Sequence, residues 1–481
     1  MARRLPRRFR DTMKRRLPFA LVALACAGPA AAAPELAPLF QDHAVLQRDK
    51  PVPVWGRAAP GEHVVVSFAG QRVGATAASD GRWVAVLAPI PASASGSDMT
   101  VAGKDSVTVH DLLVGEVWLC SGEANMEFEV DGGGFTYRVE NAVAEVAAAR
   151  YPLVRQFKVA RQAAAAPMET ARGDWRACSP ATVGRFTAVG YFFARDLLAR
   201  LGVPVGIINC TWSGTPLESW MSPAALAGFP GFSNGHSAPG AAREGDDPWV
   251  PSCLFNGMIC PLLPYAIRGA LWYQGESNVG RAPDYAAQFP ALIASWRSHF
   301  GDADLPFLWV QLANYAPPGS GKGEQWARLR EAQAGALTLP STGQAVAIDI
   351  GEPGSLYPRN KREVGRRLAL IAKARVYSIP VDFSGPAFGR AEAGGGAMRV
   401  HFLFAGDGLT ASGKPLQSFE VAGADRVFHA ASAGIDDDAV VARSPAVRLP
   451  VAVRYAWSNA PEANLYNGAG LPAAPFRSDD W

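Results

Sequence analysis

The stretch from Val117 to Phe128 has a pattern that could support chemistry, because an apolar strand gives way to a small-residue turn and then to a helix start. A sharp turn of this kind lifts one side chain off the carboxyl edge of a sheet and points backbone N–H groups at the same spot. α/β hydrolytic enzymes place a serine there, which attacks a carbonyl group. Here the side chain at the tip is Ala124, so the pattern predicts a nucleophile position without a nucleophile.

Four sequence blocks resemble the sialate O-acetylesterase group of SGNH-type carbohydrate esterases. The first block of that group normally reads Gly-Gln-Ser-Asn-Met, and residues 122–126 read GEANM. Residues 210–215 (CTWSGT) and 272–278 (WYQGESN) resemble the second and third blocks. Residues 358–368 resemble the helix that follows the base motif of the group. Together with the opening stretch 39–62, the resemblance covers essentially the whole mature chain.

The resemblance implies a Ser-Asp-His triad, and all three of its positions differ in this chain. The expected serine is Ala124, the expected aspartate is Ser355 and the expected histidine is Tyr357. A triad works because a histidine with a pKa near 6.5 accepts the serine proton while a carboxylate fixes its tautomer. A tyrosine has a pKa of about 10, so only about one in a thousand is ionised at pH 7. We therefore expect a catalytically impaired site.

Relocated groups are the alternative to an impaired site. Ser121 lies three residues before the tip, and Ser277 lies in a Gly-Glu-Ser-Asn sequence that mimics the first block. The family carries a serine at the second of these positions beside its working triad, which favours a structural role. His236 lies in an irregular segment and is interpreted as a surface-loop residue. Glu123 replaces the glutamine of the family, either as a carboxylate at the pocket or with its head facing the surface.

Polar positions in the second and third blocks are candidates for holding a carbonyl group or a sugar. The resemblance implies Gly214 and the Asn278 amide as oxyanion donors, with a tight turn and a helix cap as their alternative roles. Gln274, Glu276 and Glu123 complete the candidate binding set. Four aromatic residues suit stacking on sugars, although strand-end tryptophans are more often core residues: Trp212, Trp272, Tyr273 and Trp326.

The first 33 residues have the pattern of an export signal. Eight basic side chains precede the apolar run 17–27, which is too short to span a membrane, and alanines at 31–33 suit a signal peptidase. Without this segment, which holds eight basic residues and one acidic residue, the 46 basic and 43 acidic residues fall to 38 and 42, a net charge of −4. We predict a periplasmic or extracellular protein with no nucleic-acid or membrane partner. The sequence does not determine the oligomeric state.

The mature chain keeps five cysteines, which cannot all pair. Cys120 and Cys210 lie in apolar strand-like runs and are predicted to be buried core residues. The spacing of Cys253 and Cys260 permits a disulfide without establishing one. No Cys/His spacing typical of a zinc site is present, so we predict neither a structural metal nor a cofactor.

The hydrophobic periodicity predicts three folded parts after the signal. Residues 34–113 have the rhythm of a small antiparallel β-sandwich, and residues 378–481 that of a second β-domain. Residues 114–377 alternate strands with helices, which predicts a mainly parallel sheet; the resemblance implies a flavodoxin-like SGNH domain. We expect an insertion loop at 229–249, helices at 187–201, 285–300 and 359–374, and strands at 204–210, 267–273, 307–312 and 344–350.

Two classes of function follow from these observations. The first is a non-catalytic homologue that keeps a pocket for an acetylated glycan. The second is an active carbohydrate O-acetylesterase, acting on sialic acid or plant polysaccharide through relocated groups. The departure at all three triad positions favours the first class, and the sequence does not specify the glycan.

Overall fold

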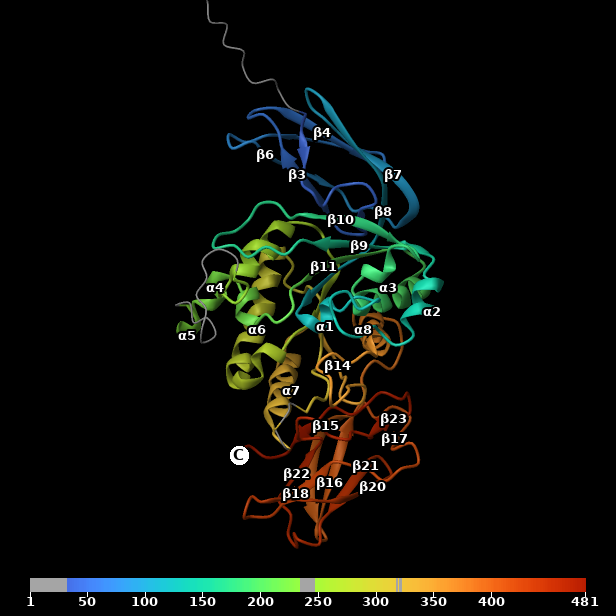
Figure 1. Ribbon diagram of the computed structural model, residues 1–481, viewed down its shortest axis with the longest axis vertical. Helices are drawn as coiled ribbons and strands as arrows, with labels where there is room; N and C mark the ends of the chain where they lie inside the picture. Colours follow the sequence, from blue (N-terminus) through green and yellow to red (C-terminus); the bar gives the residue numbers. More distant parts are fainter. Residues whose placement is uncertain (1–32, 234–246, 317–318, 320–321) are drawn as a thin grey trace, which may run out of the picture.

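The computed structural model describes residues 33–233, 247–316, 319 and 322–481. Its long axis carries three parts in chain order: β-sheets, a central α/β part, and a second group of β-sheets (Figure 1). The predicted export signal spans residues 1–33, and residues 1–32 of it lie outside the described residues. Within the described residues, no helix has the length and apolar character needed to cross a membrane.

Two sheets face each other in the N-terminal part. Side chains of β6 (Arg82–Leu87) alternate between exposed and buried, which is the period of a strand with one face on the core. The first sheet has the order β1-β3-β6, with β1 at Glu35–Leu36 and β3 at Val52–Arg57. The second contains β4 (His63–Phe68), β5 (Gln71–Thr76), β7 (Ser93–Ala102), β2 (Val45–Gln47) and the start of β8 (Ser106–Gly122).

Strand β8 connects the N-terminal sheet to the central sheet without a break. Its first half pairs antiparallel with β7, and its second half pairs parallel with β11 (Val205–Thr211) and β12 (Gly269–Tyr273). The predicted boundary between residues 113 and 114 falls inside this strand. The hydrophobic cores of the two parts are accordingly continuous.

The central sheet has the order β10-β9-β11-β8-β12-β13-β14. All neighbouring pairs are parallel except β10 with β9, which form an antiparallel edge. The mainly parallel sheet predicted from the sequence is therefore confirmed. The remaining strands are β9 (Tyr151–Val159), β10 (Gly173–Cys178), β13 (Phe307–Val310) and β14 (Thr342–Ala345).

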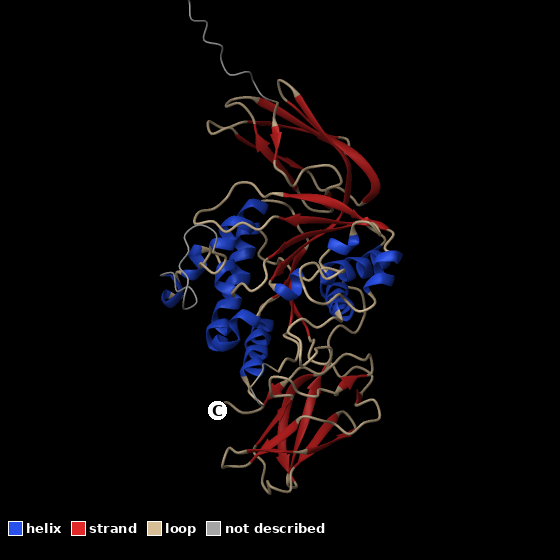
Figure 2. Ribbon diagram, viewed as in Figure 1, coloured by secondary structure: helices blue, strands red, loops and turns tan. Residues whose placement is uncertain are grey.

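Helices cover both faces of the central sheet (Figure 2). Helices α3 (Ala188–Leu201) and α8 (Lys361–Arg375) pack together on one face, and α6 (Ala282–Phe300) and α7 (Gln325–Gly335) on the other. Thr187 caps α3 by accepting a hydrogen bond from the Gly190 N–H, and Gly202 ends it in a left-handed conformation. Shorter helices are α1 (Ala124–Glu127), α2 (Ala142–Ala148), α4 (Pro223–Leu226) and α5 (Pro230–Ser233).

The C-terminal part is a pair of four-stranded antiparallel sheets with its own core. Their orders are β15-β16-β21-β20 and β19-β18-β22-β24. The strands are β15 (Ala387–Gly394), β16 (Ala397–Leu403), β18 (Phe419–Ala422), β19 (Phe428–Ala430), β20 (Ser432–Asp436), β21 (Ala439–Arg443), β22 (Ala452–Tyr455) and β24 (Phe476–Arg477), with β17 (Leu409–Thr410) and β23 (Tyr466–Asn467) as a separate pair.

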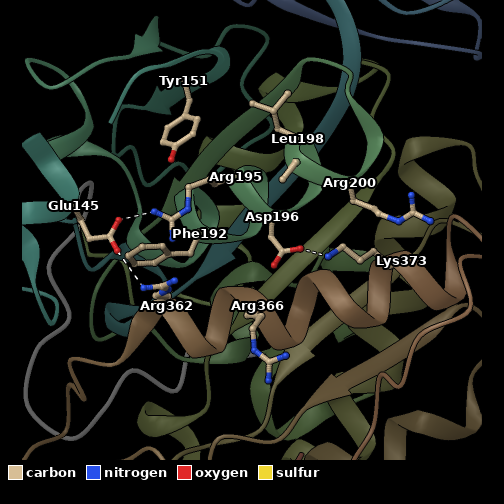
Figure 3. A pocket seen from close by; sticks show the side chains of 11 residues that line it. Glu145, Tyr151, Phe192, Arg195, Asp196, Leu198, Arg200, Arg362, Arg366 and Lys373 are labelled. Carbon is tan, nitrogen blue, oxygen red and sulfur yellow. Dashed lines mark hydrogen bonds and ion pairs between the residues drawn. The ribbon is translucent and has the colours of Figure 1, made fainter. Parts of the chain in front are cut away.

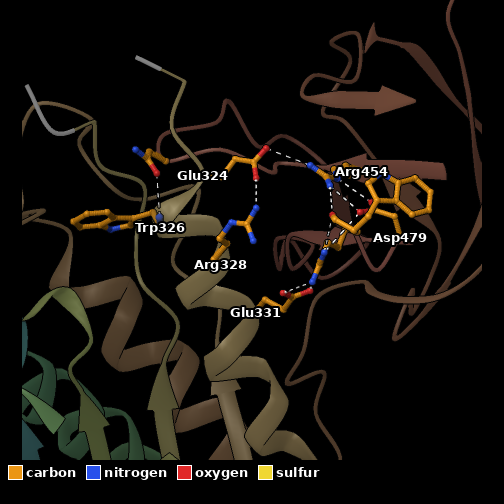
Figure 4. A network of polar contacts seen from close by, with 9 residues as sticks. Glu324, Trp326, Arg328, Glu331, Arg454 and Asp479 are labelled. Carbon is orange, nitrogen blue, oxygen red and sulfur yellow. Dashed lines mark hydrogen bonds and ion pairs between the residues drawn. The ribbon is translucent and has the colours of Figure 1, made fainter. Parts of the chain in front are cut away.

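Polar contacts attach this C-terminal part to α7 (Figure 4). Arg454 of β22 bonds to Asp479 at 2.7 Å and to Glu324, next to α7, at 3.2 Å. Arg330 of α7 is fully buried and donates to the carbonyls of Ser458 and Asn459 at 2.9 and 2.8 Å. Buried donors and acceptors satisfied in this way hold the two parts in a fixed arrangement.

Two predicted elements differ from the structure. The strand expected at 344–350 is wrong in its extent, because β14 ends at Ala345 and the next carbonyl, that of Val346, accepts from Arg367 instead of continuing the sheet. The segment 229–249 was expected to hold no helix, yet α5 begins at Pro230, a residue suited to the first turn of a helix. His236 lies outside the described residues.

Candidate active site at the sheet edge

The predicted strand-to-helix turn is present at the carboxyl end of β8. Gly122 ends the strand at φ +130°, and a Cβ there would lie 2.2 Å from the Tyr273 carbonyl oxygen, so only glycine fits. Ala124 is the first residue of α1 and is 4% exposed. The tip of the turn is therefore formed, and it carries a methyl group.

Parallel pairing brings the second and third blocks to this turn. Strands β11 and β12 flank β8 in register, so the segments that follow them leave the sheet at the same edge. The Trp212 N–H donates to the Gly122 carbonyl at 3.1 Å, and the Glu123 N–H donates to the Tyr273 carbonyl at 3.0 Å. Backbone hydrogen bonds thus join all three blocks.

The segment before α8 completes the arrangement. The Asn125 side-chain N–H₂ donates to the Leu356 carbonyl at 3.0 Å, and the Lys361 ammonium donates to the Asn125 side-chain oxygen at 2.5 Å. These contacts place Ser355 and Tyr357, the expected acid and base positions, beside the turn that carries Ala124. The four blocks named by the sequence therefore meet at one site.

Ser355 and Tyr357 make contacts that differ from those of an acid–base pair. The Ser355 hydroxyl accepts from the Tyr357 backbone N–H at 3.2 Å and closes a local turn. The Tyr357 ring packs edge-on against Phe135 at 5.0 Å, and Phe135 stacks on Phe128 at 4.8 Å. Partial burial, followed by the nearby Glu276 and Glu123, raises the pKa of Tyr357, which keeps its hydroxyl protonated at neutral pH.

Glu123 points into the protein, so the alternative of a surface-facing head is wrong. It is 2% exposed and accepts from the backbone N–H groups of Gly275 and Ser277 at 3.0 and 3.2 Å. The Ser277 hydroxyl donates to its second oxygen at 2.6 Å. Burial raises the pKa of Glu123. The hydrogen bonds favour the ionised form and lower the pKa, but the effect of burial is larger.

A second buried carboxyl lies next to Glu123. Glu276 accepts from the Asn125 side-chain N–H₂ at 2.5 Å. Burial, followed by the negative charge of Glu123, raises the pKa of Glu276 well above its ordinary value. Two neighbouring buried carboxyls cannot both ionise without a large cost, which is why the pKa of each is shifted upward.

The oxyanion and binding candidates divide into open and enclosed positions. Gly214 has φ +73° in the turn after β11, and a Cβ built on it would meet nothing within 4 Å. Asn278 is 1% exposed; its oxygen accepts from the Leu217 N–H at 2.9 Å and its N–H₂ donates to Glu218 at 3.0 Å. Gln274 is fully buried and donates to Asn278 at 2.7 Å. Gly214 therefore faces open space, while the two amides hold the third block in place.

A cleft of about 650 Å³ borders the turn on the α1 side. Glu127 of α1 accepts from the Ser213 N–H at 2.7 Å and pairs with Arg161, whose guanidinium lies 5.5 Å from the centre of the Trp212 ring. Phe135, the ring that contacts Tyr357, also lines this cleft. The cleft offers aromatic and hydrogen-bonding surface for a sugar beside the Gly214 turn.

Sequence reasoning assigned no role to Lys361, which is fully buried under the turn. Its ammonium lies 5.0 Å from the centre of the Phe128 ring and 5.6 Å from that of Tyr273. Burial lowers the pKa of Lys361 to about 7, against the nearby carboxyl groups of Glu276 and Glu352. The sequence did offer one sign of this unusual lysine: it lies in the first turn of a helix, where the helix dipole disfavours a cation.

The other sequence candidates have core positions. Ser121 is fully buried on β8 with its hydroxyl beside the Cys210 thiol, so it does not face a ligand. Cys120 and Cys210 are fully buried, as predicted, and all five cysteines of the described chain, including Cys253 and Cys260, are free thiols. Of the four aromatic candidates, Trp212 is half-buried, and Trp272, Tyr273 and Trp326 are core residues. No group of three metal-ligating side chains occurs among the described residues.

A parallel sheet whose edge joins a strand-to-helix turn, two neighbouring strand-end loops and the segment before a late helix defines the SGNH-type carbohydrate esterase fold. The family model described as carbohydrate esterase, sialic acid-specific acetylesterase, matches residues 114–372. The chain therefore belongs to the sialic acid-specific acetylesterase family.

Relatives and a solved structure agree with this assignment. The chain is 32% identical over 377 residues to the sialate O-acetylesterase of Homo sapiens, with 69% of each chain covered. It is 30% identical over 472 residues to that of Pongo abelii, with 88% of each covered. A crystal structure of a carbohydrate acetylesterase from Xanthomonas citri is 43% identical with a TM-score of 0.85, covering 93% of this chain and 100% of that one.

Proposed function

We propose that this protein is a catalytically impaired member of its family that binds an acetylated glycan at the sheet edge. The observation that carries the proposal is Ala124 at the first position of α1, where its methyl group offers no nucleophile. Loss of a catalytic triad costs about a million-fold in turnover and leaves on the order of a thousand-fold above water from binding and oxyanion stabilisation.

The contacts around the triad positions support retention of binding. Gly214 remains open, and the cleft beside it is lined by Arg161 and Phe135, with the Trp212 ring 5.5 Å from the Arg161 guanidinium. Within the described residues the Tyr357 hydroxyl has no hydrogen-bond partner, so it is available to a sugar. A neutral acetylated sugar suits this surface because the cleft combines the Phe135 ring with hydrogen-bond donors such as Arg161.

Hydrolysis of p-nitrophenyl acetate tests the impaired chemistry. We expect turnover below about 1 per second, the lower end of typical enzymes, with heat-killed protein as the background. Turnover above that value would contradict the proposal.

Calorimetric titration tests the binding. We expect heat with O-acetylated xylo-oligosaccharides or O-acetylated sialic acid and none with the deacetylated sugars. Tyr357→Phe should weaken binding by about tenfold through one lost hydrogen bond, which is worth roughly 1.5 kcal/mol. Tyr137→Phe, at a side chain that is 52% exposed, is the matched control and should change nothing. A folded protein that binds none of these sugars would contradict the proposal.

A second candidate function is esterase activity through relocated groups. It rests on the 2.6 Å hydrogen bond from the Ser277 hydroxyl to Glu123, because a carboxylate in that position can accept the serine proton. If turnover is found, Ser277→Ala should abolish it. Unchanged turnover in that variant would exclude Ser277 as the nucleophile.

We also propose that the chain is exported through its first 33 residues, because basic residues followed by an apolar run and alanines are typical of a signal peptide. Mass spectrometry of the N-terminus of protein recovered outside the cytoplasm tests this. A mature chain that still begins at Met1 would contradict it.

A further inference from the structure

A groove lies between α3 and α8 (Figure 3). Its volume is about 740 Å³, which is within the range of roughly 300–1,000 Å³ typical of small-ligand sites. Glu145 of α2 and Tyr151 of β9 complete its lining. We call it the α3/α8 groove, and none of its lining residues lines the cleft beside Gly214.

Cations outnumber acids in the lining of the groove. The only acids in the lining are Glu145 and Asp196. Glu145 is shared by two guanidiniums, at 2.5 Å from Arg195 and 3.7 Å from Arg362, so it cannot neutralise both. Asp196 pairs with Lys373. The cations of the lining are Arg195, Arg200, Arg362, Arg366 and Lys373.

Acidic residues outside the lining neutralise only part of the positive charge of the groove. Arg366 pairs with Glu363 of its own helix at 2.7 Å. Arg200 is exposed and forms no ion pair with the residues that the structure describes. With Glu363 included, five cations face three acids, which leaves two positive charges in the groove. Residues 34–481 together are net negative, so this is a local concentration of the opposite sign.

The groove also offers aromatic surface. The Tyr151 side chain is directed toward Arg195, with its hydroxyl leading, and the Phe192 ring lies beneath that guanidinium at 4.9 Å (Figure 3). Guanidinium groups bind carboxylates in a planar, two-point geometry. Phe192 is 3% exposed, so the half-buried Tyr151 ring is the aromatic surface that suits the apolar face of a sugar ring.

We propose that the α3/α8 groove binds a carboxylate-bearing sugar, such as a unit of a polyuronate chain. The carboxylate of the sugar contacts Arg200 and the guanidiniums of Arg195 and Arg362, which share one acid. The sugar ring packs on Tyr151. Concavity and volume favour a sugar-sized anion over a flat macromolecular surface. The proposal does not depend on the chemistry at Ala124, because the two sites share no lining residue.

Calorimetric titration with trigalacturonate and with neutral xylotriose tests the proposal. We expect trigalacturonate to bind, and its affinity to fall at least about tenfold between low and high ionic strength, because exposed charges are screened. Xylotriose should not bind at this groove. Equal affinity for the two trisaccharides would overturn the proposal, and so would displacement of trigalacturonate by inorganic phosphate at the same concentration.

Matched charge reversals locate the site. Arg200→Glu changes an exposed side chain that has no ion pair among the described residues, so the fold is expected to tolerate it. It should weaken trigalacturonate binding at least about tenfold, which corresponds to 1.4 kcal/mol. Arg448→Glu makes the same charge change on an exposed residue of the C-terminal part and should leave binding unchanged. Equal losses in the two variants would show a general charge effect and overturn the assignment to the groove.

Discussion

The Lys361 ammonium lies 2.5 Å from the side-chain oxygen of Asn125, although 236 residues separate the two in the chain. Asn125 follows Ala124 directly, and its amide also bonds to Glu276 and to the Leu356 carbonyl. One buried cation and one amide thus join the turn after β8, the third block and the start of α8. This contact holds the segment with Ser355 and Tyr357 against the turn without any help from those two side chains.

Replacing Lys361 tests the energetic effect of this burial. Burial lowers its pKa from 10.5 to about 7, so between these pH values the unfolded chain holds a proton that the folded protein releases. The contribution of Lys361 to stability therefore rises with pH across that window. We expect the free energy of unfolding of the parent, relative to Lys361→Met, to increase from pH 7 to pH 10 in urea unfolding experiments.

The control for this experiment is Lys322→Met, at a side chain that is 91% exposed. The unfolding free energy of that variant should follow the parent at every pH. Parallel pH curves for the parent and Lys361→Met would contradict a lowered pKa at Lys361.

Replacing Glu123 by glutamine tests the buried carboxyl. Its pKa is raised by burial, so above its ordinary value of 4.5 the folded protein holds a proton that the unfolded chain has lost. This contribution to stability falls as pH rises from 4.5. Because an amide oxygen still accepts from Gly275 and Ser277, Glu123→Gln should gain stability over the parent as pH rises from 5 to 7.

Chemical unfolding at pH 5 and pH 7 measures this difference. Glu392→Gln, at a side chain that is 57% exposed, is the control and should show no pH-dependent gain. A Glu123→Gln protein that is less stable than the parent at pH 7 would mean that the hydrogen bonds keep this carboxyl ionised.

Close packing of α3 on α8 depends on Gly365. A Cβ on this residue would lie 2.7 Å from the Phe192 Cβ and 2.9 Å from the Val189 carbonyl oxygen. Gly365→Ala should therefore destabilise the protein by about 1–3 kcal/mol, as expected for overpacking. Gly335→Ala is the matched control, because a Cβ there would meet nothing within 4 Å, and it should raise stability by up to about 1 kcal/mol. Equal effects on the unfolding midpoint would contradict this packing argument.

The sequence predicted the sheet and its active edge well because both rest on local patterns. Apolar strands alternating with helices placed the ends of β8, β11 and β12 at one edge. Residues 122–126 signalled the turn through a glycine followed by a helix start. Strand β9 was missed because YPLVRQFKV lacks a clear period; its Arg155 is buried through bonds to Asp111, a residue 44 positions away.

The long-range contacts of the site could not be read from local patterns. Strand β8 crosses the predicted boundary at 113/114 because its pairing changes from β7 to β11 and β12 without any break in its apolar character. The inward orientation of Glu123 depends on the N–H groups after β12, which lie about 150 residues later in the chain. Such tertiary partners decide whether a carboxyl is a surface group or a buried one.

Rebuilding the triad tests whether Ala124, Ser355 and Tyr357 account for the impaired chemistry. The double variant Ala124→Ser with Tyr357→His should gain little activity on p-nitrophenyl acetate, because Ser355 has no carboxylate to orient the imidazole. Adding Ser355→Asp should raise turnover far more than any pair of changes, by on the order of a hundred-fold over the double variant, because a triad acts as a unit. Lys361 and Asn125 already hold the segment 355–357 beside the turn, so the three new side chains start from the correct backbone. Ala124→Ser with Ser355→Asp, which lacks the histidine, is the control for unspecific gains. A triple variant no faster than this control would mean that the pocket has diverged beyond its three triad positions.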